Sequence, residues 1–329
     1  MSILITGGAG YIGSHTVSYF IEQNEDVTVV DNLQSGYRQS VRIEDFYHID
    51  LRDKEALDKV FKTHNIEAVI HFAANSLVGE SMEKPYEYYH NNVYGMMCLL
   101  DVMKDNNVRK IVFSSTAATY GEPKNIPILE DNETNPTNTY GETKLAMEKM
   151  MKWFDQGYGI KYVSLRYFNA AGAHGSGNIG EDHHPETHLI PLILQVPLGQ
   201  RDKIYMFGDD YPTEDGTCIR DYIHVMDLAA AHYQALEYLR KDNPSEVFNL
   251  GNGNGYSVKE VIDMARQVTK HSIPAEVKGR RAGDPAVLIA SLEKAKDILG
   301  WKPQFNSLEK IISDAWNWHR NNPDGYAKK

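Results

Sequence analysis

Residues 2–13 read SILITGGAGYIG, and this stretch decides the fold of the chain. The apolar run at residues 2–6 predicts a buried parallel strand, and a helical pattern follows the glycines through residue 21. Gly7, Gly10 and Gly13 permit a tight turn and a close approach of the backbone to a pyrophosphate, which then sits on the helix N-terminus. The spacing GxxGxxG is weak evidence alone, but the flanking strand and helix supply the context that a dinucleotide-binding unit requires.

Strands and helices alternate along the chain after this unit. Further strands are predicted at residues 27–30, 46–49, 68–72, 110–113, 162–166 and 246–250, and helices at 54–64, 86–103, 225–239, 258–269, 293–299 and 308–318. The alternation is typical of an α/β protein with a Rossmann-type doubly wound parallel sheet, which binds ligands at the carboxyl ends of its strands. We expect residues 1–170, plus about 218–240, to form the cofactor domain. Residues 171–217 and 241–329 are expected to form a smaller, interleaved C-terminal substrate domain.

Polar and small residues stand where several of these strands end. Asp31 follows the second strand about 20 residues after the glycines, where a carboxylate accepts hydrogen bonds from a free ribose 2′-hydroxyl and repels a 2′-phosphate. Asp50 and Leu51 stand where an adenine edge could lie, and Ala73 and Ala74 leave room for a cofactor. This pattern favours NAD over NADP as the cofactor.

Residues 139–144, TYGETK, carry a candidate base. Tyr140 and Lys144 lie on one face if this segment opens a helix. A tyrosine with a pKa of about 10 is a poor base at pH 7. A nearby ammonium favours the phenolate, and so would the positive ring of an oxidised nicotinamide. Tyr140 could then take a proton from a sugar hydroxyl while a hydride leaves the same carbon. The plainer interpretation of a lone YxxxK is a chance pair on a surface helix.

Composition limits the class of protein. The net charge of −11 disfavours non-specific nucleic-acid binding. The sequence has no charged-then-apolar leader and no apolar run near 18 residues, so neither export nor membrane insertion is expected. Two cysteines, Cys98 and Cys218, are too few for a disulfide framework and are typical of buried thiols in a reducing cytoplasm.

Motifs spread over nearly the whole chain resemble the extended short-chain dehydrogenase/reductase family and, within it, the UDP-glucose 4-epimerases. They lie at residues 7–15, 71–74, 78–81, 140–144, 165–169, 207–216, 220–228 and 280–284. The glycine motif and YxxxK are general to the superfamily, and the later motifs are typical of the epimerases. The resemblance implies reversible epimerisation at sugar C4 of UDP-glucose and UDP-galactose through a 4-keto intermediate, with transient hydride transfer to bound NAD. It also implies a homodimer.

The resemblance assigns roles to particular residues. It implies a catalytic Thr116, Tyr140 and Lys144. It implies NAD binding by Gly7, Gly10, Tyr11, Ile12, Gly13, Asp31, Asn32, Asp50, Leu51, Phe72, Ala73, Ala74, Asn91, Ser114, Tyr140, Lys144 and Phe168. It implies substrate binding by Thr116, Tyr140, Asn169, His188, Leu189, Tyr205, Phe207, Arg220, Tyr222, Arg281, Asp284 and Leu288. Two positions depart from the common pattern: Ser76 replaces a lysine that contacts the cofactor, and His188 replaces a uridine-side asparagine.

The substrate half carries its own chemical signals. Residues 172–188 are rich in glycine, histidine and acids, but no recurring ligand spacing points to a metal, so we expect a substrate loop and no metal site. Arg220 and Arg281 could give this acidic protein the local cations that a diphosphate needs. The alternative interpretation of the two arginines is solvated surface charge. Tyr205 and Phe207 are predicted to bind substrate, and the alternative for them is core packing. The resemblance also implies that Leu288 falls at a position that lines the sugar pocket in this family, which makes activity on UDP-N-acetylhexosamines a further expectation.

Three rival functions remain in view. A nucleotide-sugar 4,6-dehydratase would carry an Asp-Glu pair directly after Thr116, where this chain has Ala117 and Ala118. A net NAD-dependent dehydrogenase or reductase would consume added cofactor. A non-catalytic nucleotide-binding regulator would not need the Thr116, Tyr140 and Lys144 set.

Overall fold

The computed structural model describes residues 1–281 and 284–326 of the chain. Its strands are β1 (Ser2–Thr6), β2 (Asp26–Asp31), β3 (Phe46–His48), β4 (Ile66–His71), β5 (Lys110–Ser114), β6 (Lys161–Tyr167), β7 (Asn169–Ala171), β8 (Ile204–Phe207), β9 (Ile219–Arg220), β10 (Tyr222–His224), β11 (Glu246–Leu250), β12 (Tyr256–Ser257), β13 (Ala275–Lys278) and β14 (Val287–Leu288). Its α-helices are α1 (Tyr11–Glu22), α2 (Lys54–Thr63), α3 (Val78–Glu83), α4 (Pro85–Tyr88), α5 (Gly95–Asp105), α6 (Thr139–Tyr158), α7 (Leu189–Leu194), α8 (Val225–Arg240), α9 (Val258–Thr269) and α10 (Leu308–Asn321). Short 3₁₀ turns lie at Arg38–Ser40 and Ala117–Tyr120, and π-helical turns at Tyr89–Tyr94 and Ala295–Leu299.

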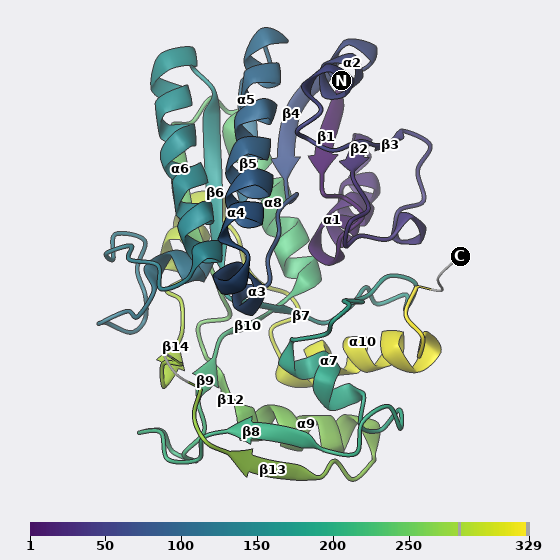
Figure 1. Cartoon of the computed structure of the whole chain (residues 1–329), viewed down its shortest axis with the longest axis vertical. Helices are drawn as coiled ribbons and strands as arrows, with labels where there is room; N and C mark the ends of the chain where they lie inside the picture. Colours follow the sequence, from purple (N-terminus) through teal and green to yellow (C-terminus); the bar gives the residue numbers. More distant parts are fainter. Residues whose placement is uncertain (282–283, 327–329) are drawn as a thin grey trace.

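A seven-stranded parallel sheet forms the larger part of the molecule, in the order β11-β6-β5-β4-β1-β2-β3 (Figure 1). The predicted Rossmann-type doubly wound sheet is therefore confirmed. The chain starts in the middle of the sheet with β1, whose residues are all buried, and then winds outward in both directions. This topology brings the carboxyl ends of β1, β2, β4, β5 and β6 to one edge.

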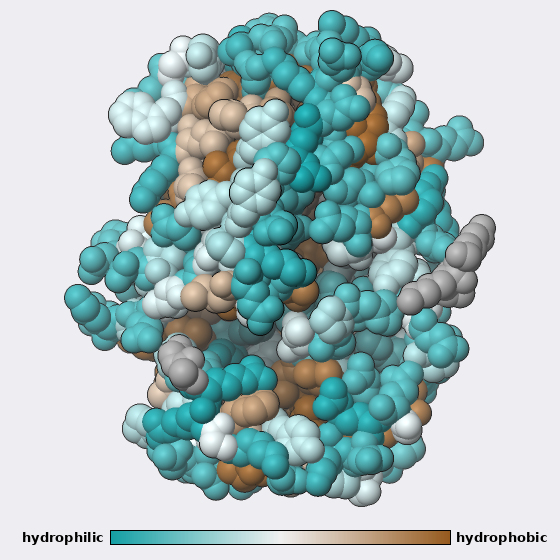
Figure 2. Space-filling view, in the orientation of Figure 1, coloured by the Kyte–Doolittle hydropathy of each residue, from teal (hydrophilic) through white to brown (hydrophobic). Residues whose placement is uncertain are grey.

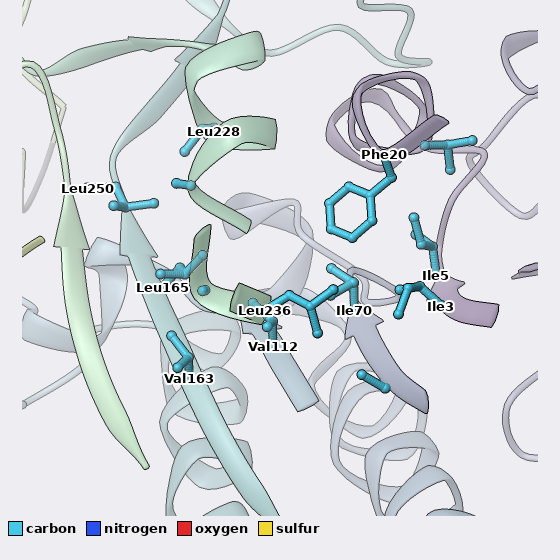
Figure 3. Close-up of a cluster of buried hydrophobic side chains, with 14 of the residues drawn as sticks. Ile3, Ile5, Phe20, Ile70, Val112, Val163, Leu165, Leu228, Leu236 and Leu250 are labelled. Carbon is cyan, nitrogen blue, oxygen red and sulfur yellow. The ribbon is translucent and has the colours of Figure 1, made fainter. Parts of the chain in front are cut away.

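Helices cover both faces of this sheet because its side chains alternate. Ile3 and Ile5 point to one face, where they pack with Phe20 of α1 and Leu236 of α8 (Figure 3). Leu4 points to the opposite face, in a second cluster built with residues of α2, α5 and α6. The near-continuous apolar sequence of β1 is thus explained by burial on both sides.

The remaining elements form a second region below the sheet in the view of Figure 1. Three small sheets, β10-β7, β12-β9-β14 and β13-β8, lie there together with α7, α9 and α10. Their own core joins Ile190 and Ile193 to Val261 and Ile311. Helix α9 begins with a capping box in which Ser257 and Glu260 each accept a backbone N–H from the other.

Two sequence expectations differ from the structure in detail. The predicted substrate half includes residues 246–250, but β11 pairs in parallel with β6 and so extends the large sheet. Pairing with a distant strand decides this placement, which no local pattern could reveal. The helix expected at 86–103 is interrupted by the π-helical turn at Tyr89–Tyr94. The rest of the two-domain division stays a prediction, and residues 282–283 of the 280–284 motif lie outside the described residues.

Within the described ranges, the structure has no helix both long and apolar enough to cross a membrane.

Candidate active site

A cavity of about 970 Å³ opens between the carboxyl edge of the large sheet and the second region. The surface is hollowed between these two parts (Figure 2). All residues predicted to bind the cofactor line this cavity: Gly7, Gly10, Tyr11, Ile12, Gly13, Asp31, Asn32, Asp50, Leu51, Phe72, Ala73, Ala74, Asn91, Ser114, Tyr140, Lys144 and Phe168. A large cavity with several converging polar groups is the usual form of a small-molecule site.

The predicted substrate residues divide into two groups. The residues that line the cavity are Thr116, Tyr140, Asn169, His188, Arg281 and Asp284. The other predicted substrate residues are not among the described residues that line the cavity: Leu189, Tyr205, Phe207, Arg220, Tyr222 and Leu288. Their predicted contacts with substrate therefore have no direct counterpart in the cavity wall.

The glycine turn after β1 has no room for larger residues at two of its positions. Gly7 has a φ of +73°, and a Cβ on it would lie 2.5 Å from the backbone nitrogen of Ala73. A Cβ on Gly13 would lie 2.2 Å from the carbonyl oxygen of Gly7. Gly10 lines the cavity, and its Cβ would meet only that same oxygen, at 3.4 Å. A side chain at residue 10 would therefore fill space above the N-terminus of α1, where a pyrophosphate binds.

Asp31 holds a fixed carboxylate at the end of β2. Its Oδ2 accepts the backbone N–H of Ala9 at 2.9 Å, and its Oδ1 accepts that of Leu33 at 2.7 Å. Burial raises the pKa of Asp31, while these two hydrogen bonds lower it. Each carboxylate oxygen keeps a further lone pair for a hydroxyl donor. The glycine turn, the helix N-terminus and Asp31 together fit a dinucleotide with a free ribose hydroxyl.

Asp50, at the adenine end of the predicted site, is fixed in a different way. It accepts a hydrogen bond from Asn32 at 3.0 Å and pairs with Arg52 at 2.6 Å. The Arg52 guanidinium holds the pKa of Asp50 well below its usual range. Asp50 is therefore an ionised hydrogen-bond acceptor at neutral pH.

Tyr140, Lys144 and Thr116 meet at the carboxyl end of β5. Asn138 caps α6 by accepting the backbone N–H of Gly141 at 2.8 Å, and this cap sets Tyr140 and Lys144 in the first turns. Both line the cavity, so the spacing of four does place them on one face. Thr116, two residues beyond β5, accepts the backbone N–H of Ala118 at 3.1 Å and shares a hydrogen bond with Tyr140.

The pKa of Tyr140 differs from the sequence expectation. Burial raises it to about 12, and the hydrogen bond with Thr116 lowers it only in part. The Lys144 Nζ donates to the carbonyl oxygen of Ser114 at 2.7 Å and lies 5.9 Å from the centre of the Tyr140 ring. Burial also lowers the pKa of Lys144 to about 7, against the attraction of Glu148, which raises it. The lysine alone therefore does not make Tyr140 a strong base.

Glu148 lies one turn beyond Lys144 and belongs to a buried network. It accepts a hydrogen bond from Ser115 at 2.5 Å and forms an ion pair with Arg166 at 2.6 Å. Both ion-pair side chains are only 6% exposed. Losing one partner of such a pair would leave an uncompensated buried charge, so the network holds Ser115, the neighbour of Thr116, against α6.

Several residues missed as site residues also line the cavity. They are Val30, Gln34, Ser35, Gly36, Ile49, Asn75, Ser76, Leu77, Val78, Gly79, Glu80, Ala118, Tyr167, Ala170, His183, Pro185 and Thr187. Buried Asn92 holds the segment at 75, because its Oδ1 accepts the N–H of Asn75 at 2.8 Å and its Nδ2 donates to Thr143 at 3.0 Å. The sequence motif at residues 78–81 could have identified this part of the cavity wall.

The two arginines occupy different positions. Arg281 lines the cavity, and its guanidinium stacks 4.0 Å from the ring centre of Phe207. The Arg220 side chain is 12% exposed and forms an ion pair with Asp284, which lines the cavity. Arg220 thus reaches the cavity wall through Asp284, while Arg281 presents its charge directly.

Comparison with known proteins gives the family. The model of the NAD dependent epimerase/dehydratase family matches residues 3–251. The UDP-glucose 4-epimerase of Halalkalibacterium halodurans is 64% identical over 327 residues, which cover 99% of this chain and 98% of that protein. A crystal structure of a UDP-glucose 4-epimerase matches with a TM-score of 0.98 and 61% identity, covering 100% of both chains. The UDP-glucose 4-epimerase of Bifidobacterium longum in complex with NAD⁺ and UDP matches with a TM-score of 0.92 and 41% identity, over 99% of this chain and 100% of that one. By sequence and by structure, the chain belongs to the NAD dependent epimerase/dehydratase family.

Proposed function

We propose that this protein is an isomerase that interconverts UDP-glucose and UDP-galactose by epimerisation at C4, with NAD as its bound cofactor. One observation carries the proposal: Thr116, Tyr140 and Lys144 line the same cavity as the glycine turn and Asp31. A cofactor on that turn and a sugar beside Tyr140 would share this cavity. Two similar proteins are UDP-glucose 4-epimerases, one of them in complex with NAD⁺ and UDP, and they support the assignment.

The cofactor would be held by groups at the ends of β1 and β2. The N-terminus of α1 would receive the pyrophosphate, and Asp31 would accept a ribose hydroxyl. When bound, NAD supplies a hydride acceptor for the sugar C4 and then a hydride donor to the opposite face. Asp31 excludes a 2′-phosphate by charge and by the space that it occupies.

Tyr140 handles the proton of the sugar O4 hydroxyl. Thr116 shares a hydrogen bond with Tyr140, so the two oxygens define a site where that hydroxyl can bind. Tyr140 accepts the O4 proton as the ketone forms and returns it when the alcohol is restored. Burial keeps the phenol neutral in the protein alone, with a pKa of about 12. Proton acceptance therefore depends on a positive charge brought into the site.

The residues near Thr116 argue against a dehydratase. Ala118 lines the cavity and offers only a methyl group where elimination of water would need an acid and a base. The Ala118 backbone N–H instead fixes the Thr116 hydroxyl. Arg281 gives the cavity a cation suited to a diphosphate.

The test is turnover without added cofactor. We expect purified protein and UDP-galactose to give UDP-glucose at equilibrium, followed by nuclear magnetic resonance, with no NADH accumulating. A 4-keto-6-deoxy product would indicate a dehydratase, and stoichiometric NADH a dehydrogenase. Absence of any sugar conversion by NAD-loaded protein would favour a non-catalytic regulator.

We also propose a homodimer. Three large apolar side chains on neighbouring helices α5 and α6 and the turn before them are exposed: Tyr94 at 41%, Met97 at 45% and Trp153 at 67%. Apolar side chains gathered on a surface are typical of an interaction site. Light scattering should give twice the chain mass, and Trp153→Glu should reduce it toward one.

A further inference from the structure

Four side chains of the loop between β7 and α7 converge on one point. They are Glu181, His183, Glu186 and His188, and one ligand atom from each lies within 4.8 Å of all the others. Both histidines also line the large cavity, so the cluster is part of its wall. Two imidazole nitrogens and two carboxylates are a donor set that divalent transition metals accept, zinc in particular.

Two of the distances in this cluster are those expected around one tetrahedral ion. His183 Nδ1 lies 3.3 Å from Glu181 Oε1 and 3.6 Å from Glu186 Oε2. His188 Nδ1 lies 3.4 Å from Glu186 Oε1 and 2.7 Å from Glu181 Oε1. Donor atoms bound to zinc at about 2.0–2.2 Å in a tetrahedron lie about 3.3–3.6 Å apart. The two distances from His183 Nδ1, to Glu181 Oε1 and to Glu186 Oε2, match this spacing. The contact of His188 Nδ1 with Glu181 Oε1 would widen, and its 3.4 Å contact is with Glu186 Oε1, the other oxygen of that carboxylate.

Two donor atoms are buried and aimed into the cluster without a hydrogen-bond partner. In the part of the chain that the structure describes, neither Glu181 Oε1 nor His183 Nδ1 makes a hydrogen bond of normal geometry, although His188 Nδ1 lies 2.7 Å from Glu181 Oε1. The Glu181 side chain is only 3% exposed. A buried carboxylate oxygen in this condition is costly unless a cation satisfies it. His183 Nδ1 and Glu181 Oε1 lie near each other but are not aligned for a hydrogen bond. This arrangement is expected when both atoms direct lone pairs to a common third atom.

The second carboxylate is already oriented. Glu186 Oε1 accepts the backbone N–H groups of Thr187 at 2.7 Å and His188 at 2.8 Å. These bonds hold the Glu186 side chain, which is 8% exposed, and leave Oε2 facing His183. Support of a ligand by further hydrogen bonds is typical of built metal sites.

We propose that Glu181, His183, Glu186 and His188 bind one divalent zinc ion that fixes the loop at 172–188 against the cavity. Imidazoles must be neutral to bind a metal, and two neutral imidazoles with two carboxylates would have a charge of −2, which one divalent ion cancels. Four protein ligands fill a tetrahedral shell and leave no position for substrate, so the site is structural. It stands beside the glycine turn, since His183 packs edge-on against Tyr11 with ring centres 6.1 Å apart. The inference does not rest on the proposed function, because metal binding is measured without turnover.

The test uses the full-length, NAD-loaded protein and its metal content. After dialysis against a chelator, wild-type protein should take up one Zn²⁺ per chain, and its melting temperature should rise by several degrees at saturating Zn²⁺. Substitution with Co²⁺ should give the intense visible absorption of a four-coordinate ion. Glu181→Gln should weaken Zn²⁺ binding by at least about 100-fold. The matched control is His184→Gln, because His184 is 62% exposed and pairs with Asp182 outside the cluster, so it should bind as the wild type does.

Several results would overturn the proposal. Wild-type protein that takes up no Zn²⁺ would make the cluster an ion-pair network of charged histidines and carboxylates. Equal affinity in wild-type and Glu181→Gln protein, or the faint absorption of six-coordinate Co²⁺, would indicate adventitious binding. If Glu181→Gln does not fold, Glu186→Gln takes its place, and the stoichiometry and Co²⁺ spectrum of the wild type still decide the question.

Discussion

Lys144 stands beside Tyr140 without bonding to its phenol: the Nζ lies 5.9 Å from the ring centre and donates to the Ser114 carbonyl oxygen instead. Thr116 is the residue that shares a hydrogen bond with Tyr140. In the proposed mechanism, Tyr140 exchanges the proton and Thr116 orients it. Lys144 holds the Ser114 carbonyl oxygen and does not by itself supply the positive charge that Tyr140 needs.

Tyr140→Phe should retain the fold and the bound NAD but lose most turnover. Only the proton-accepting oxygen is removed, and general acid–base groups contribute typically about 10²–10⁴-fold to rate. Steady-state kinetics on UDP-galactose, with NAD content and melting temperature as controls, checks the prediction. Near-normal epimerisation by this variant would remove Tyr140 from the mechanism.

Lys144 should make stability depend on pH above neutrality. Its pKa is about 7 in the folded chain and about 10.5 in an unfolded one, so between these values the unfolded state binds the extra proton. The unfolding free energy should therefore rise from pH 7 toward pH 10, by a few kcal/mol since each pKa unit corresponds to about 1.4 kcal/mol. Below pH 7 both states are protonated and this dependence ends.

Lys144→Met is the control for that dependence. Urea unfolding of both proteins without NAD should find the variant more stable at pH 7, with a difference that shrinks as pH rises toward 10. A difference that stays constant with pH would show that the buried ammonium is not the cause.

Asp31 should select NAD over NADP. Denaturing the purified protein should release NAD⁺ or NADH, because the carboxylate accepts a ribose hydroxyl and repels a 2′-phosphate. Asp31→Asn should narrow the ratio of NAD to NADP affinity, whereas Asp50→Asn, at the adenine end, should leave the ratio unchanged. Recovery of NADP from wild-type protein contradicts the role of Asp31.

Leu288 should limit the range of sugars. It pairs in register with Arg220 on neighbouring strands, although it does not line the cavity wall that the described residues form. We predict measurable but inferior activity on UDP-N-acetylglucosamine. The family resemblance implies that this position borders the bound sugar, so Leu288→Tyr should suppress that activity selectively and Leu288→Cys should raise it, since a change of size in a hydrophobic pocket is worth roughly 1–3 kcal/mol in discrimination. If the wild type has no such activity and Leu288→Cys adds none, another residue sets the limit.

The cofactor half could be predicted from sequence because its signals are local. A strand followed by Gly7, Gly10 and Gly13 determines the conformation of the turn that follows it. Because the sheet is parallel, Asp31 at the end of the next strand then lies at the same edge of the sheet as this turn. The substrate half depends on contacts between distant segments. Tyr205 and Leu288 lie on short strands whose partners decide where they point, and neither reaches the cavity wall that the structure describes.

Electrostatics and the conformation of irregular loops were the other features that could not be predicted from the sequence. The pKa of Tyr140 is raised because the phenol is buried, and this burial cannot be inferred from the sequence spacing between Tyr140 and Lys144. The convergence of Glu181, His183, Glu186 and His188 depends on how the loop at 172–188 folds, and no regular ligand spacing in the sequence indicates it.

The central claim is C4 epimerisation by hydride transfer, and the fate of the C4 hydrogen tests it most directly. UDP-galactose carrying deuterium at C4 should be incubated with the NAD-loaded protein in ordinary water, and the UDP-glucose formed should be analysed by mass spectrometry and nuclear magnetic resonance. We predict that the product keeps its deuterium at C4, because the hydride does not exchange with solvent. Loss of the deuterium to water, or deuterium retained only in unconverted UDP-galactose, would contradict the account.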